Sequence, residues 1–176
     1  MRKRMKFGKY AGLFLVVTLI FVTGSAMAGE DISTFPNCPH CGMDRNKFSH
    51  SRMLIKYDDE SVVGVCSLHC AAVDLTLKLD KSPVEILVGD YNSRELIDAE
   101  KAIWVLGGGK MGVMTHRAKW AFSDPEAADK FIGENGGEKV EFERALGAAY
   151  EDMHKDIKRI RENRKMKRMK NEHNHQ

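Results

Sequence analysis

The sequence predicts an α+β protein in which two small tandem ββαβ units are followed by an amphipathic, basic C-terminal helix. Three observations predict this fold class. Short apolar runs typical of strands alternate with segments whose apolar residues recur at helical spacing. The order strand, strand, helix, strand occurs twice, at an offset of 56 residues. A last segment places apolar residues at steps of three and four among many lysines and arginines.

The first 28 residues have the order of charges and apolar residues that is typical of a secretory signal. Five Lys or Arg precede an apolar run from Ala11 to Val22. This run is shorter than the roughly 20 residues that a membrane-spanning helix needs, and Ala26 and Ala28 fit cleavage before Gly29. We therefore expect an exported, periplasmic protein, with an uncleaved membrane anchor as the alternative.

Residues 29–90 are expected to form the first ββαβ unit, which contains a Cys-rich metal-binding segment. Gly42 and Pro39 predict a turn in that segment rather than a helix. The three strands of the unit are expected at residues 53–57, 62–66 and 84–88. Ser67 is a suitable N-cap for the intervening helix, because apolar residues repeat behind it at helical spacing, and Pro83 ends that helix.

Residues 91–142 are expected to form the second ββαβ unit. Its three strands are predicted at residues 102–106, 118–122 and 139–142. A glycine loop at residues 107–114 joins the first two of these strands. The helix is expected to be capped near Ser123 or Asp124 with Pro125 in its first turn, and to end at Gly136-Gly137.

Residues 143–176 are expected to form the amphipathic helix and a basic, histidine-containing tail that frays into solvent. Between residues 154 and 170 the sequence has nine Lys or Arg and two acidic residues, whereas acidic residues dominate the rest of the chain after residue 28. An exported protein rarely meets nucleic acid, so we do not expect it as a partner. An anionic membrane or protein surface is the expected partner of the tail.

Four cysteines form two close pairs, Cys38-x2-Cys41 and Cys66-x3-Cys70. Structural disulfides are one interpretation, because an oxidising compartment favours them. A bond between such near neighbours, however, closes almost no loop and restricts the unfolded chain little. Cys66 ends a strand and Cys70 lies in the first turn of the next helix, so both thiols can converge with Cys38 and Cys41. The spacing therefore predicts a metal site.

The choice of metal rests on the other candidate ligands. Four cysteines alone are typical of structural zinc, which remains an alternative. The sequence also supplies thioethers at Met43 and, in the glycine loop, at Met111 and Met114, and sets that mix thiolate, thioether and imidazole select Cu(I). His69 is the histidine that we add to the set, since it lies between Cys66 and Cys70. The alternative role for the methionines is core packing.

The Cys38-Pro39-His40-Cys41 motif also has the active-site sequence of DsbA-type disulfide oxidases. A thioredoxin-like fold needs a buried strand before that motif and a long helix that begins at it. Here a polar stretch precedes the motif and Gly42 follows it, so a thiol-disulfide oxidoreductase remains an alternative. The sequence shows no Ser-His-Asp grouping, phosphate loop or paired carboxylates, and we do not expect an enzyme.

Taken together, these residues resemble the NosL-type copper chaperones, which are associated with nitrous-oxide reductase maturation. The resemblance rests on Cys41-Gly42-Met43, Val65-Cys66-Ser67, Ile97-Asp98-Ala99 and Met111-Gly112, and it continues to Glu143. It implies a pair of ββαβ units, Cu(I) capture in the periplasm and delivery to an exported copper enzyme, nitrous-oxide reductase or a similar one. Cys70 and the long helix after Arg144 are additional to the family pattern.

Overall fold

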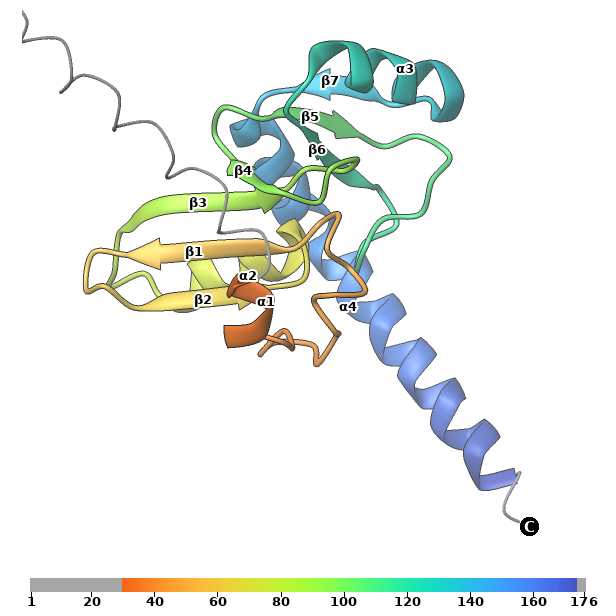
Figure 1. Cartoon of the computed structure of the whole chain (residues 1–176). Coiled ribbons are helices and arrows are strands. Elements are labelled where there is room, and N and C mark those ends of the chain that lie inside the picture. Colours follow the sequence, from red (N-terminus) through yellow and green to blue (C-terminus); the bar gives the residue numbers. More distant parts are fainter. Residues whose placement is uncertain (1–29, 174–176) are drawn as a thin grey trace, which may run out of the picture.

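A computed structural model describes residues 30–173 and shows two small antiparallel sheets with a long C-terminal helix (Figure 1). The α+β class predicted from the sequence is therefore confirmed. The predicted signal segment and His175 lie outside the described residues. Within residues 30–173, no helix has both the length and the apolar character that crossing a membrane requires.

The first sheet has the strand order β2-β1-β3-β4, and every neighbouring pair is antiparallel. Its strands are β1 (Met53–Tyr57), β2 (Val62–Val65), β3 (Pro83–Gly89) and β4 (Leu96–Asp98). Alternate residues of β1, namely Met53, Ile55 and Tyr57, are buried, as expected for a strand with one face on the core. Helix α2 (Leu68–Leu77) packs against β1 and β2 and covers this sheet.

The second sheet repeats the topology of the first, with the order β6-β5-β7. Its elements are β5 (Ile103–Leu106), β6 (Lys119–Phe122), α3 (Pro125–Asn135) and β7 (Glu138–Val140). In each unit the first strand is central and pairs antiparallel with the second strand on one side and the third on the other. Asp124 caps α3 by accepting from two backbone N–H groups, as the sequence predicted. The duplicated ββαβ arrangement is thus present.

Two elements were not predicted from the sequence. Helix α1 (Glu30–Thr34) occupies the polar stretch before the cysteine turn. Strand β4 pairs with β3 although it follows residue 90, so the two sheets do not divide at that residue. The units are also joined directly, because Asp90 forms a parallel bridge with Ala121.

Helix α4 (Phe142–His173) begins against the body of the protein and ends away from it (Figure 1). Phe142, Ala145 and Ala149 are buried, and the helix packs on both α2 and β5. Alanines permit this close approach between backbones. Beyond Ile160 the side chains described are all exposed, yet the helix continues to His173 rather than fraying where the apolar positions end.

A buried ion cluster joins α1 to the first sheet. Oδ2 of Asp31 accepts from Nη2 of Arg45 at 2.8 Å and from Nε of Arg52 at 2.9 Å, and both arginines are 0% exposed. Arg45 also donates to the carbonyls of Phe35, Met53 and Val65. One carboxylate thereby neutralises part of the charge of two buried guanidinium groups, while main-chain carbonyls satisfy their remaining donors.

We predict that Asp31→Asn destabilises the reduced protein by about 3–5 kcal/mol, because it leaves two buried cations without their carboxylate. Urea-induced unfolding would measure the loss. Asp129→Asn is the control, since it removes an exposed ion pair with Lys139 and should change the midpoint little. A loss of less than about 1 kcal/mol in Asp31→Asn, the range of a surface pair, would show that the carboxylate is dispensable.

Candidate metal centre

Cys38 and Cys41 lie in a tight turn between α1 and β1. The N–H of Cys38 donates to the carbonyl of Met43 at 2.9 Å, and the N–H of Gly42 donates to the carbonyl of Cys38 at 2.8 Å. Gly42 has φ of 78°, and a Cβ there would meet nothing within 4 Å, so the backbone angle rather than lack of space calls for glycine. This turn, which we call the cysteine turn (residues 38–43), holds the first pair of thiols together.

The second pair comes from the junction of a strand and a helix. Cys66 directly follows β2, and Cys70 lies in the first turn of α2. Ser67 is the N-cap, but its side chain makes no cap hydrogen bond; its Oγ lies 3.8 Å from Sγ of Cys66. The N-terminus of a helix favours negative charge, so this position suits thiolates.

The four cysteine sulfurs converge, and they lie within 4.8 Å of one another. Sγ of Cys66 is 3.4 Å from Sγ of Cys41 and 3.7 Å from Sγ of Cys70. All four cysteines are free, and Cys41 is the one that is partly exposed. A tetrahedral site with metal–sulfur bonds of about 2.3 Å places its sulfurs about 3.8 Å apart. The cluster therefore has the dimensions of a four-thiolate metal site.

Because the four sulfurs lie close together, the pKa values of some cysteines are lowered and those of others are raised. Hydrogen bonds from Cys41, Cys66 and Cys70 lower the pKa of Cys38. The same closeness to Cys38, together with burial, raises the pKa of Cys66 and of Cys70. The hydrogen bond with Cys38 raises the pKa of Cys41, but hydrogen bonds from Cys66 and Cys70 lower it overall. The arrangement thus favours thiolates at Cys38 and Cys41 that are hydrogen-bonded by the thiols of Cys66 and Cys70. A metal ion would take the place of those protons.

Buried positive charge lies beside this cluster. Nε of Arg45 donates at 3.1 Å to the carbonyl of Val65, the residue before Cys66. Burial lowers the pKa of Arg45, whereas its attraction to Asp31 and to the Cys38 thiolate raises it. The attraction between Arg45 and Cys38 favours an anionic group at the cluster, as a metal–thiolate centre is.

His40, inside the cysteine turn, binds that turn to α2. Its Nε2 lies 2.8 Å from Oδ1 of Asp74, a carboxylate that also accepts from the Tyr57 hydroxyl at 2.5 Å and pairs with Lys78. Burial alone would raise the pKa of Asp74, but these hydrogen bonds lower it overall. The histidine of the Cys-Pro-His-Cys motif therefore anchors the turn to the helix that carries Cys70.

His69 does not join the sulfur cluster in this structure. Its ring nitrogens are not among the ligand atoms that converge there, and its Nδ1 lies 3.5 Å from Oδ2 of Asp156 in α4. Both side chains are buried, and burial lowers the pKa of His69. The residue thus connects α2 to α4.

The three candidate methionines occupy different environments. Met43 and Met114 are half-buried and pack against the core, whereas Met111 is 72% exposed in the glycine loop. Met114 has φ of 63°, a left-handed conformation that non-glycine residues rarely adopt. Their role as copper ligands remains a prediction.

Asp31, Arg45 and Asp74 were missed by sequence reasoning, although they position the cysteines. An isolated charged residue in a polar stretch or on a helix is usually solvated, so the sequence carried no sign that these three are buried. The sequence feature that comes closest to indicating this buried charge is the presence of two arginines, Arg45 and Arg52, shortly after the cysteine turn.

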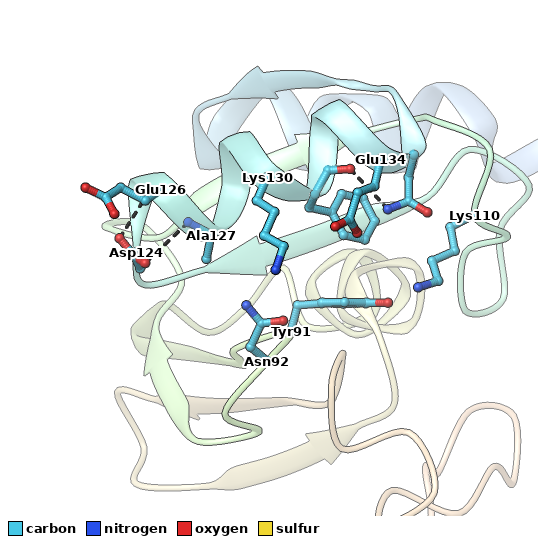
Figure 2. A pocket seen from close by; sticks show the side chains of 10 residues that line it. Tyr91, Asn92, Lys110, Asp124, Glu126, Ala127, Lys130 and Glu134 are labelled. Atoms are coloured by element: carbon cyan, nitrogen blue, oxygen red, sulfur yellow. Dashed lines mark hydrogen bonds between the residues drawn. The ribbon is translucent and has the colours of Figure 1, made fainter.

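A surface hollow of about 570 Å³ lies away from the cysteines, beside α3 (Figure 2). Its lining includes Tyr91, Lys110, Lys130 and Glu134. Nζ of Lys110 lies 5.3 Å from the centroid of the Tyr91 ring, a cation–π contact that covers the ring. The hollow is open, and its lining carries charges of both signs without a converging set of ligands. We therefore take the cysteine cluster, whose four thiols converge, as the candidate functional site.

Comparison with known proteins agrees with this choice of site. The model of the NosL family matches residues 30–145, a range that contains all four cysteines and both sheets and ends in the first turn of α4. No curated protein matches the chain significantly. Among solved structures, the chain is similar to the copper chaperone NosL from Shewanella denitrificans, with 24% identity and a TM-score of 0.49 over 61% of this chain and 87% of that one.

Proposed function

The chain belongs to the NosL family, and on that premise we propose that it is an exported Cu(I)-binding metallochaperone that delivers copper to an exported copper enzyme. The observation that carries the proposal is the convergence of four free thiols inside the family-matched region. Thiolates are soft ligands that bind Cu(I), and thioethers at Met43, Met111 and Met114 would shift the preference from Zn(II) toward Cu(I). Such a protein binds and releases an ion and needs no catalytic group.

The arrangement of the thiols suits transfer as well as binding. Cys38, Cys66 and Cys70 are buried and would shield the ion from water, while Cys41 is partly exposed and offers a side from which a recipient can approach. The predicted signal at residues 1–28 supports work in the periplasm, and the resemblance to NosL-type chaperones supports nitrous-oxide reductase or a similar enzyme as the recipient.

A structural zinc site is the second candidate, and a specific observation favours it. Four cysteines with three of them buried are the ligand set and the enclosure of a structural zinc centre. The third reading, a thiol-disulfide oxidoreductase, fits less well. Cys38 and Cys41 lie in a turn rather than at the start of a helix, and both share their cluster with two further thiols.

We predict that the reduced protein without its first 28 residues binds Cu(I) much more tightly than Zn(II). The physical reason is that the candidate set mixes thiolates with the neutral thioethers of Met111 and Met114, a mixture that selects Cu(I). Titration with each metal against a competing chelator would measure both affinities. Quadruple replacement of the cysteines by serine should abolish binding of either ion.

The opposite ranking would support the zinc reading. If a chelator strips Cu(I) while Zn(II) remains bound, and if the fold melts when zinc is removed, then the cluster is a structural centre and the chaperone proposal is wrong.

We also predict that the double variant Met111→Ala and Met114→Ala binds Cu(I) about tenfold more weakly, which corresponds to about 1.4 kcal/mol. The glycine loop that carries both residues would then close over the ion. Copper titration of the two single variants and the double variant would test this, with thermal melting of the copper-free proteins alongside.

The single variants separate ligation from packing. Met111 is 72% exposed, so its truncation should leave the melting temperature unchanged. Met114 packs against the core, so some loss of stability is expected there whatever its role. Unchanged copper affinity in all three variants would remove both methionines from the site.

A further inference from the structure

The second half of α4 is strongly basic, and the metal centre does not require this positive charge. We call residues 154–170 the basic segment; it contains nine Lys or Arg, and every side chain from Arg161 to Lys170 is exposed. The family match ends at residue 145, so this segment lies outside the matched region. Figure 1 shows it extending away from both sheets.

One flank of the basic segment concentrates the charge. Residues spaced three and four apart share a helix face, and we call the face formed by Lys158, Arg161, Arg164, Lys165 and Arg168 the basic flank. These residues line one hollow together with His154, Ile157 and one acidic residue, Glu162. Like charges at such spacing destabilise an isolated helix, and the side chains from Arg161 to Lys170 are all exposed, so little packing compensates. Negative charge on a partner would relieve the repulsion.

The basic flank is next to the metal centre. Nη2 of Arg164 donates to the carbonyl of Cys41 at 3.4 Å, and Cys41 is the most exposed of the four cysteines. Earlier in the helix, Asp156 faces His69 and also accepts from the N–H of His116, which holds α4 against α2 and the loop before β6. A molecule that binds the flank would therefore lie beside the accessible side of the cluster.

We propose that the basic flank docks an acidic surface of the protein that accepts the copper; this inference rests on the proposed function. A helix that lies on a membrane needs one apolar face. Ile160 and Met169 are nine residues apart, two and a half turns, and so lie on opposite sides of α4. The basic flank, moreover, lies beside Cys41. An acceptor protein that binds this flank would therefore bring its own copper ligands close to the cluster.

Docking would assist a simple exchange of ligands. A thioether or thiolate sulfur of the acceptor forms a bond to Cu(I) while the bond to Sγ of Cys41 breaks. Copper stays in the monovalent state, and the released thiolate takes a proton from water. Electrostatic attraction by the flank would raise the rate at which acceptor and donor meet.

The test compares two triple variants of the full chain after residue 28. The flank variant carries Arg161→Glu, Lys165→Glu and Arg168→Glu. The matched control carries Lys155→Glu, Lys167→Glu and Lys170→Glu, which make the same change in charge on other sides of the helix. The probe is a Glu-rich peptide with a Met-x-x-Met copper site, and its counterpart has Gln in place of Glu.

For the unaltered protein we expect binding of the Glu-rich peptide and copper transfer to it, both weakened by salt. In the flank variant both should fall about tenfold, with less than about a twofold change in the control and equal Cu(I) affinity in all three proteins. Peptide binding to the copper-free protein tests the surface independently, so a failure to bind Cu(I) would count against the proposed function and not against the docking site.

Two outcomes would overturn the docking proposal. Equal losses in the flank variant and the control would show a general effect of charge rather than a site. Binding to phosphatidylglycerol vesicles that depends on the flank, without preference for the Glu-rich over the Gln-rich peptide, would assign the surface to a membrane instead.

Discussion

The position of the four thiols depends on one buried interaction, the ion cluster of Asp31 with Arg45 and Arg52. Arg45 lies two residues after the cysteine turn, and its guanidinium reaches Asp31 in α1, Met53 at the start of β1 and Val65 at the end of β2. Cys38 and Cys41 precede Arg45 in the sequence. Cys66, the first cysteine of the second pair, directly follows Val65, whose carbonyl accepts from Arg45. Because Arg45 is 0% exposed, loss of its carboxylate partner would leave a charge that water cannot reach.

That constraint explains how a site can be assembled from segments that are distant in the sequence. Cys38 and Cys41 belong to the cysteine turn, and two interactions hold this turn near Cys66 and Cys70. The ion cluster fixes it against β2 through Arg45, and the hydrogen bond between His40 and Asp74 fixes it against α2. Pre-positioned ligands lower the cost of ordering on binding. The buried Arg45 guanidinium attracts the Cys38 thiolate and so favours negative charge at the cluster.

The sequence predicted those features of the fold and the site that depend on local residue patterns. The strands other than β4, a cap of α3 near Ser123 or Asp124, and the repeated ββαβ topology follow from apolar periodicity and turn residues. The pairing of close cysteines indicated the cluster. The sequence did not predict α1, because five residues with a single apolar side chain, Ile32, carry no periodic signal; the structure buries Asp31 of this helix. The spacing of His69 between two cysteines indicated a ligand, and that role remains a prediction. In this structure its side chain faces Asp156 of α4, 87 residues away in sequence, a contact that no local pattern could indicate.

The function proposed for the cysteine cluster, binding of Cu(I) by sulfur, is tested most directly by X-ray absorption spectroscopy of the reduced, copper-loaded protein. Cys70 is the informative position, because it lies beyond the family pattern and yet within the cluster. We expect a first shell of sulfur alone, which changes in Cys70→Ser as well as in Cys38→Ser. A shell dominated by nitrogen or oxygen, or one that neither substitution changes, would contradict the proposed function.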